Sequence, residues 1–317
     1  MKHQISKKNR IRGIMMVLAG ASLWGISGTV AQVLFQQKGF QTGWLVSVRL
    51  LFSGVLLLSL AALRKQEGSI WRVWKDARDR SSILIFGLIG LLGVQYTYFA
   101  AVETGNATTA TLLQFLGPAF ITLYLALRLG KVPQKKDLFA LVLAMIGTFL
   151  LVTNGSLDGL TVSGMAVFWG LASAVTAAFY TLYPDRLIDR WGSTITVGWG
   201  MLVGGVGLSL ISPPWNLHGQ SWSVYTGLLV LFVILFGTLI AFYLYLDSLR
   251  FISPAEVGIL GSAEPLSAAV MSVLWLNHSL GLYEMIGGLF IIATVCILSV
   301  KADVKERVFS VPGGKTG

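Results

Sequence analysis

The chain has 317 residues, of which 55% are hydrophobic and only 12% are charged, and its 36 glycines come in addition to the hydrophobic fraction. A soluble domain carries about 25% charged residues, so this composition excludes an ordinary cytosolic enzyme, and the single cysteine, Cys296, excludes a disulfide-stapled secreted domain. The net charge of +10 would suit a nucleic-acid-binding protein, but the positions of the charges along the chain point elsewhere.

Ten apolar segments are predicted to span a membrane, because a helix needs about 20 mainly apolar residues to cross the hydrocarbon core. In chain order they cover residues 13–34, 43–63, 82–102, 105–128, 137–153, 161–183, 194–212, 223–247, 255–276 and 282–300. The fifth is short, and glycines interrupt the seventh, which ends at Pro213 and Pro214. The first follows several basic residues, as a signal peptide does, but its apolar run is too long and nine more spans follow it, so we expect an uncleaved helix.

The basic residues predict the orientation of these spans, since Lys and Arg in short loops stay on the cytoplasmic side. With the N-terminus inside, all of the 24 basic residues fall in inner segments except Lys38, in an outer loop, and Arg49, within a span. Both chain ends are therefore predicted to be cytoplasmic. The same distribution argues against a nucleic-acid partner and places the positive charge against anionic lipid headgroups.

The two halves of the chain resemble each other. GIMMVLAGAS from Gly13 aligns with GMAVFWGLAS from Gly164, and QYTYFAAVE from Gln95 aligns with FYLYLDSLR from Phe242. Each half holds five predicted helices, an odd number, so the second copy enters the bilayer inverted. The predicted fold is thus an all-α integral membrane protein of ten transmembrane helices in two inverted repeats, residues 1–153 and 161–300, followed by a cytoplasmic tail, residues 301–317. Inverted repeats are common in secondary transporters, where they expose one central site alternately to each side.

Four segments carry a resemblance to a known family. They are LWG at 23–25, VRLLFSG at 48–54, YTYFAAVETGNATTATLLQFLGPAF from Tyr96 and YLYLDSLRFISPAEVGILGSAEPLSAAV from Tyr243. They resemble the EamA-type permeases of the drug/metabolite transporter superfamily, over nearly the whole chain. The resemblance implies a carrier in a bacterial inner membrane, often an exporter of amino acids or other small metabolites. The family commonly has a glutamate shortly after the fourth and ninth helices, where this chain has Lys131 and His278, so no role is transferred to those positions.

Two prolines, Pro118 and Pro265, occupy matching places near the middle of the fourth and ninth spans. Proline has no N–H, so it removes the hydrogen bond to the carbonyl four residues earlier, here of Gln114 and Gly261. A carbonyl without a partner must face protein or a water-filled cavity. Paired interruptions predict a transport site, and two purely structural kinks are the alternative.

Glu264 and Arg49 are the charged residues predicted to lie within spans. Intramembrane acids are costly and generally functional, so Glu264 is a candidate to bind a cationic group of the substrate or to carry a proton, with a packing role as the alternative. Arg49 matches an arginine that the family often shows in its second helix. A structural role, as an anchor near the headgroups or as a partner to helix carbonyls, is the favoured interpretation, and capture of a substrate carboxylate is the alternative.

Aromatic residues supply further candidates for the substrate path. Trp24 lies near the middle of the first span and is predicted either to stack on an organic substrate or cation or to pack in the core. Tyr96 and Tyr98 fall in the outer half of the third span, and their counterparts Tyr243 and Tyr245 fall in the inner half of the eighth. We expect these tyrosines to line opposite ends of one pathway, with plain packing as the alternative.

Other charged residues near the ninth span have local explanations. Ser253, Pro254 and Glu256 form the Ser-Pro-x-Glu pattern of a helix start, in which serine and glutamate cap free N–H groups. Asp247 and Arg250 are three residues apart at the end of the eighth span and are expected to form a local ion pair.

The predicted function is secondary active transport of a small organic metabolite, such as an amino acid, by alternating access, with protons as a candidate coupling ion. The sequence has no GxxxxGK[ST] loop to suggest coupling to ATP. It has no cluster of His, Cys and acidic residues for a metal and no Ser/His/Asp set, so we expect no cofactor and no catalytic residues. An intramembrane enzyme and a channel remain the alternatives, and the sequence leaves substrate, direction and oligomeric state open.

Overall fold

The computed structural model describes residues 7–63, 70–129, 134–156 and 159–309. Every regular element in these ranges is a helix. Eight helical stretches among them are long and apolar enough to cross a membrane: Asn9–Lys38, Thr42–Ala61, Ala77–Thr104, Ala107–Arg128, Lys135–Thr153, Gly164–Leu182, Val224–Tyr245 and Glu256–Leu276. The prediction of an all-α, multi-pass membrane protein is confirmed. Lys131 and the end of the predicted tail lie outside the described residues.

The seventh and tenth predicted spans are shorter than expected. They correspond to the apolar helices Ser193–Ser209 and Leu282–Leu298. The first of these ends shortly before Pro213 and Pro214, where the chain leaves helical geometry. The second is the apolar part of a longer helix that continues through charged sequence to Phe309.

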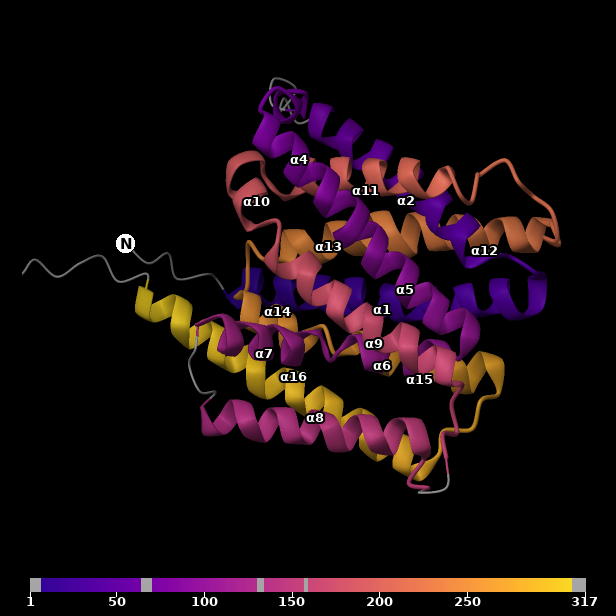
Figure 1. Ribbon diagram of the computed structural model, residues 1–317, viewed down its shortest axis with the longest axis vertical. Helices are drawn as coiled ribbons and strands as arrows, with labels where there is room; N and C mark the ends of the chain where they lie inside the picture. Colours follow the sequence, from indigo (N-terminus) through magenta and orange to yellow (C-terminus); the bar gives the residue numbers. More distant parts are fainter. Residues whose placement is uncertain (1–6, 64–69, 130–133, 157–158, 310–317) are drawn as a thin grey trace, which may run out of the picture.

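The elements follow one another along the chain in the order drawn in Figure 1. They are α1 (Lys7–Lys38), α2 (Thr42–Ala61), η2 (Arg72–Trp74), α4 (Ala77–Ile85), η3 (Phe86–Leu91), α5 (Leu92–Thr104), α6 (Ala107–Gln114), α7 (Gly117–Leu129), α8 (Lys135–Thr153), α9 (Gly164–Leu182), α10 (Asp185–Trp191), α11 (Ser193–Ser209), α12 (Val224–Ile234), η4 (Leu235–Ile240), α13 (Ala241–Ser248), α14 (Pro254–Leu260), α15 (Ala263–Leu276) and α16 (Leu282–Phe309).

The long helices pack side by side as a bundle. α2 packs against α11, α5 against α9, and α8 against α16, while α1 contacts both α13 and α15. Figure 1 shows α8 and α16 at one edge of the bundle and α2, α4 and α11 at the opposite edge. The largest buried cluster joins residues of α1, α2, α5 and α11, and a second lies among α6, α8, α9 and α16.

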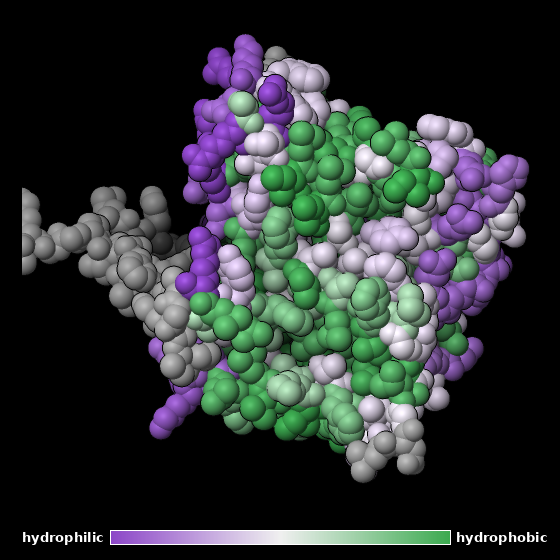
Figure 2. All heavy atoms as spheres, viewed as in Figure 1, coloured by the Kyte–Doolittle hydropathy of each residue, from purple (hydrophilic) through white to green (hydrophobic). Residues whose placement is uncertain are grey.

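The outer surface of the bundle is apolar across its middle. Figure 2 shows a broad hydrophobic band on the visible face, with hydrophilic residues gathered at its two ends. On α8, for example, Phe139, Val142, Met145 and Phe149 are exposed large hydrophobic side chains. A band of this kind is what a protein needs where its surface meets hydrocarbon instead of water.

The third and eighth spans each contain a short π-helical segment, η3 and η4. A π-turn inserts one extra residue into an α-helix, and such bulges are frequent at functional sites. η3 packs against α11, and η4 packs against α1 and α2. The two wider turns therefore lie at helix contacts inside the bundle.

The contact between α1 and α15 is close enough to require a glycine. A Cβ atom added to Gly25 would lie 2.2 Å from the carbonyl oxygen of Glu264 and 2.8 Å from the backbone nitrogen of Ala268. Small residues let membrane helices approach backbone to backbone. Gly25 thus fixes how closely α1 can approach the helix that carries Glu264.

A buried carboxylate ties the start of α4 to α10. Asp79 accepts hydrogen bonds from Arg186 (3.0 Å) and from the indole N–H of Trp191 (2.9 Å), and it pairs with Arg190 at 2.6 Å. Its side chain is fully buried. An ion so placed is tolerated only because it is paired and hydrogen-bonded, so these contacts hold the two segments together.

The local explanations for the charges near the ninth span are confirmed. Ser253 and Glu256 form a capping box at the start of α14, and Glu256 also pairs with Arg10 at 2.7 Å. Asp247 and Arg250 form an ion pair at 3.0 Å.

Replacing Gly25 by alanine should destabilise the protein, because the new methyl group would overlap the backbone of α15. Overpacking of this kind costs about 1–3 kcal/mol, so the melting temperature of the purified protein should fall by several degrees. Gly227→Ala is the matched control, since a Cβ at Gly227 meets nothing within 4 Å and alanine favours helix. Equal melting temperatures of the two variants would contradict the close contact.

The start of α4 should lose stability in acid. The hydrogen bonds from the Arg190 side chain and from the backbone N–H groups of Arg78 and Asp79 hold the pKa of Asp76 below its usual value. A carboxylate with a lowered pKa contributes stability above its unfolded pKa and loses it as the pH falls through the folded pKa. The melting temperature of the protein should therefore exceed that of Asp76→Asn at neutral pH, and this gap should narrow as the pH falls below about 4, the ordinary pKa of aspartate. A gap that does not change with pH would show that the charge of Asp76 does not matter.

Candidate functional site

A cavity of about 440 Å³ lies between the helices of the two halves of the chain. Its wall includes residues of α1, α2, α5, α6, α7 and α9 and also of α13, α14, α15 and α16. Eight of the residues singled out from sequence line it: Trp24, Arg49, Tyr98, Gln114, Pro118, Tyr245, Gly261 and Glu264. Pro265 is not among the lining residues, although its neighbour Glu264 is.

The fourth and ninth spans are both interrupted at the wall of this cavity. α6 ends at Gln114 and α7 begins at Gly117, while α14 ends at Leu260 and α15 begins at Ala263. In each case the proline lies in the first turn of the second helix, where its missing N–H costs nothing. The new helix therefore starts in the middle of the span, next to the cavity.

Because Pro265 has no N–H, the Gly261 carbonyl was expected to lack its helical hydrogen bond, but the structure gives it another donor. It accepts a hydrogen bond from the backbone N–H of Glu264 at 2.9 Å. The chain tightens at Gly261 and Ser262, so a donor three residues ahead replaces the N–H that Pro265 lacks. The polar group that this break offers to the cavity is accordingly the side chain of Glu264.

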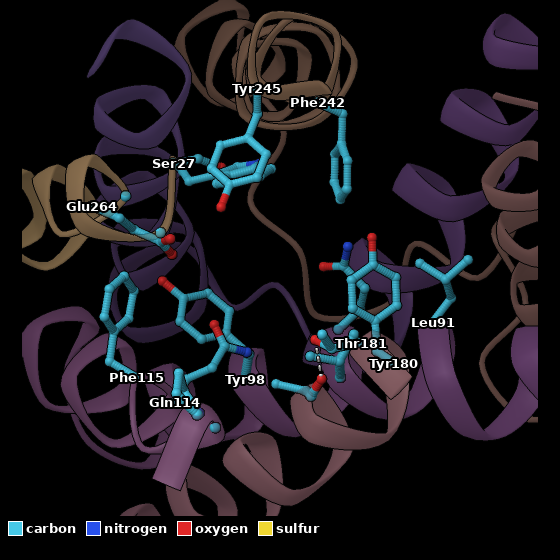
Figure 3. A pocket seen from close by; sticks show the side chains of 18 of the residues that line it. Ser27, Leu91, Tyr98, Gln114, Phe115, Tyr180, Thr181, Phe242, Tyr245 and Glu264 are labelled. Carbon is cyan, nitrogen blue, oxygen red and sulfur yellow. Dashed lines mark hydrogen bonds between the residues drawn. The ribbon is translucent and has the colours of Figure 1, made fainter. Parts of the chain in front are cut away.

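Glu264 lies in the first turn of α15 and is half-buried. In Figure 3 its carboxylate points into the cavity, and the hydroxyl groups of Tyr98 and Tyr245 point into the same space. Within the described residues, the carboxylate accepts no hydrogen bond and forms no ion pair within 4 Å. The helix N-terminus is the favourable end for an anion, which helps this position to hold a charge.

Aromatic rings form the wall around Glu264. The ring of Trp24 lies 4.8 Å from that of Tyr245 and 4.9 Å from that of Phe242, centroid to centroid. Tyr98 is buried, and its hydroxyl is hydrogen-bonded to that of Thr111 at 3.0 Å. The acid therefore faces a space bounded by flat apolar surfaces and two phenol groups.

Arg49 contributes the positive charge of the cavity. Its side chain is buried, its Nε donates to the Thr238 hydroxyl at 3.0 Å and its Nη2 donates to the Gly237 carbonyl at 3.2 Å. Its guanidinium also lies 4.6 Å above the ring of Phe99. Gly237 and Thr238 belong to η4, so Arg49 satisfies a carbonyl in the π-helical turn. It has the helix-carbonyl partner that its structural interpretation requires, and its role toward a substrate stays a prediction.

The structure places Tyr96 and Tyr243 away from this cavity. The ring of Tyr96 packs against Trp169, at 5.8 Å between centroids, and Tyr243 is 38% exposed on α13. Neither lines the cavity, whereas Tyr98 and Tyr245 do. Residues two positions apart on a helix point in nearly opposite directions. The role of Tyr96 and Tyr243 at the ends of a pathway stays a prediction.

Sequence reasoning passed over Ser27, Gln95 and Tyr180, which also line the cavity. The alignment of the two halves did contain a signal for Gln95. Gln95 and Tyr98 are three residues apart, and so are Phe242 and Tyr245, so each pair shares a helix face. Ser27 carried no such signal, and its hydroxyl is buried without a hydrogen-bond partner among the described residues.

Comparison with known proteins agrees with the fold. The EamA-like transporter family matches residues 11–153 and 164–300. The chain is 38% identical over 298 residues to the uncharacterized inner membrane transporter YicL of Salmonella typhimurium, covering 93% of this chain and 98% of that protein. It is 25% identical over 301 residues to the threonine/homoserine exporter RhtA of Escherichia coli K12, covering 93% and 94% of the two chains.

A solved crystal structure shares the same fold. It superposes with a TM-score of 0.58 at 17% sequence identity, over 94% of this chain and 99% of the other. At this identity the likeness concerns the fold alone. The family match and the similarity to YicL together cover nearly the whole sequence. The protein therefore belongs to the EamA-like transporter family and is a multi-pass membrane transporter.

Proposed function

We propose that the protein is a secondary transporter that moves a small organic metabolite, such as an amino acid, by alternating access around the central cavity. The observation that carries this proposal is the cavity itself. It is bounded by both halves of the chain, and it is flanked by a helix break from each half. It contains an intramembrane acid, Glu264, whose carboxylate has no hydrogen-bond or ion-pair partner among the described residues. Broken helices and buried acids of this kind mark substrate and ion sites in carriers.

The packing of the helices supports an inverted-repeat arrangement of ten spans. α1 contacts α13 and α15, and its counterpart α9 contacts α5 and α7, which are the counterparts of α13 and α15. α2 packs against its own counterpart α11, and α8 against its counterpart α16. Each half also has one π-helical segment and one broken span. α11 has 17 residues, which is near the lower limit of about 17 residues for a span.

The position of the cavity supports a state that is open toward the cytoplasm. We infer that both chain ends and the basic loops lie on that side of a bacterial inner membrane, because Lys and Arg in short loops stay cytoplasmic. Ile121, Thr181 and Gly258, which line the cavity, are in the predicted inner halves of their spans. Near the predicted outer end, Gln36 donates to the Gly105 carbonyl at 2.7 Å, and Trp44 donates to the Pro214 carbonyl at 2.8 Å. These contacts join helix ends on the far side of the cavity, which suits a carrier that loads its substrate from the cytoplasm.

The family relatives support an amino-acid substrate and export. RhtA is described by its name as a threonine/homoserine exporter. In the present chain, Glu264 is the group available to carry a proton across the cavity, so protons are the proposed coupling ion.

Counterflow in proteoliposomes tests this function. Vesicles containing the purified full chain and loaded with unlabelled L-threonine should accumulate labelled L-threonine transiently, because a carrier exchanges solutes through one site. A panel of amino acids and related metabolites should be examined in the same way. Absence of exchange for every solute, or flux that neither saturates nor responds to solute on the opposite side, would contradict a carrier.

Neutralising Glu264 should reduce this exchange strongly. Glu264→Gln is expected to lower the counterflow rate at least tenfold at every pH, because the carboxylate faces the cavity. Glu103→Gln is the matched control, since Glu103 is an exposed acid at the end of α5. Unchanged transport by Glu264→Gln across a pH series, both in exchange and in net transport driven by a pH gradient, would remove Glu264 from both substrate binding and proton coupling.

A further inference from the structure

The cavity holds two opposite charges that do not pair with each other. Arg49 projects from α2 and Glu264 from α15, and both line the same space. Among the described residues no ion pair joins them within 4 Å, although they interact electrostatically across the cavity. Charges buried in a membrane protein normally pair or face a ligand path. A ligand that carries one charge of each sign would give both side chains an oppositely charged partner.

We propose that this cavity binds the zwitterionic head of an α-amino acid, with its ammonium group at Glu264 and its carboxylate at Arg49. The proposal rests on the transport function above and adds the chemistry and orientation of the substrate. A zwitterion brings no net charge into the bilayer. It offers a cation to the acid and an anion to the arginine at the same time.

The surroundings of Glu264 suit an ammonium group. An ammonium has three N–H donors and no acceptor, and the carboxylate of Glu264 has no competing donor among the described residues. The phenol oxygens of Tyr98 and Tyr245 point into the same part of the cavity and can accept further hydrogen bonds (Figure 3). The aromatic faces of Trp24 and Tyr245 also attract a cation.

The surroundings of Arg49 suit a carboxylate. A guanidinium has five N–H donors in a rigid plane, of which Thr238 and Gly237 use two. These two bonds and the ring of Phe99 fix the plane of the group, so its remaining donors are oriented before a ligand arrives. Preorganised donors of this kind recognise a carboxylate better than a flexible lysine would. Gln95, on the same wall, adds an amide donor.

The rest of the cavity determines which side chains fit. A volume of about 440 Å³ lies within the range of about 300–1,000 Å³ typical of small-molecule sites. Away from the two charges, the wall includes Leu91, Phe115 and Phe242. The structure therefore assigns specificity to the zwitterionic head and leaves an apolar space for neutral side chains of different sizes.

Analogues that lack one charge test the assignment directly. Binding to the purified full chain would be measured by thermal stabilisation with L-threonine, L-homoserine, L-leucine and L-phenylalanine. The tightest of these would then be compared with its N-acetyl derivative, which has no ammonium, and with its amide, which has no carboxylate. We expect the amino acid to bind at least tenfold more tightly than either analogue.

Variants of the two charged residues should show a crossed pattern. Glu264→Gln should weaken the amino acid at least tenfold and leave the N-acetyl derivative unchanged. Arg49→Gln should weaken the amino acid and leave the amide unchanged. A general loss of structure would weaken all ligands together, so the retained ligand shows that each variant is folded. Glu103→Gln, at an exposed position, should bind all three ligands as the original protein does.

Several results would overturn the assignment. Analogues that bind as tightly as the amino acid, or variants that weaken all ligands equally while their melting temperatures are normal, would exclude recognition of both charges. If Arg49→Gln does not fold, the Glu264→Gln arm decides alone, and equal weakening of amino acid and N-acetyl derivative contradicts the proposal. If no amino acid binds but another solute exchanges in counterflow, the zwitterion assignment fails and the transport function stands.

Discussion

The hydrocarbon core of a membrane offers no hydrogen-bond partner, so every departure from α-helical geometry must be satisfied inside the protein. Among the described residues, the chain departs from that geometry at η3, at η4 and at the breaks before Pro118 and Pro265. At two of these places a neighbouring group supplies a hydrogen bond to a backbone carbonyl. Glu264 donates its backbone N–H to the carbonyl of Gly261, and Arg49 donates to the carbonyl of Gly237. The irregular backbone is thus concentrated where side chains surround the cavity.

The same constraint links the structural and functional interpretations of the charged residues. Arg49 binds a carbonyl of η4 and also lines the cavity, so support of the π-turn and contact with a ligand are not alternatives. The backbone N–H of Glu264 closes a helix break, while its carboxylate points into the cavity and has no partner in the part of the chain that the structure describes. In both residues the contacts within the protein fix the group's position and leave part of its bonding capacity for the cavity.

Sequence alone predicted the helical membrane fold and a substantial part of the site. Hydropathy predicted most span boundaries. The rarity of charged residues within spans identified Glu264 and Arg49, because burying an ion in a membrane has a high free-energy cost. Sequence was less specific for the tyrosines. Tyr96, Tyr98, Tyr243 and Tyr245 were all expected along one pathway, and Tyr98 and Tyr245 line the cavity. Sequence does not give the rotation of a helix about its axis, and the π-helical segments η3 and η4, which precede these tyrosines, change that rotation by one extra residue. The partner of the Gly261 carbonyl depended likewise on a local turn that no composition rule predicts.

The glycine at position 25 has a mechanical consequence. The backbone of Gly25 lies directly against the peptide group of Glu264, and no side chain separates the two helices there. The helix that carries Gly25 also packs against η4, whose Gly237 carbonyl accepts a hydrogen bond from Arg49. The first helix is therefore in contact with the supports of both charges and helps to fix their spacing across the cavity.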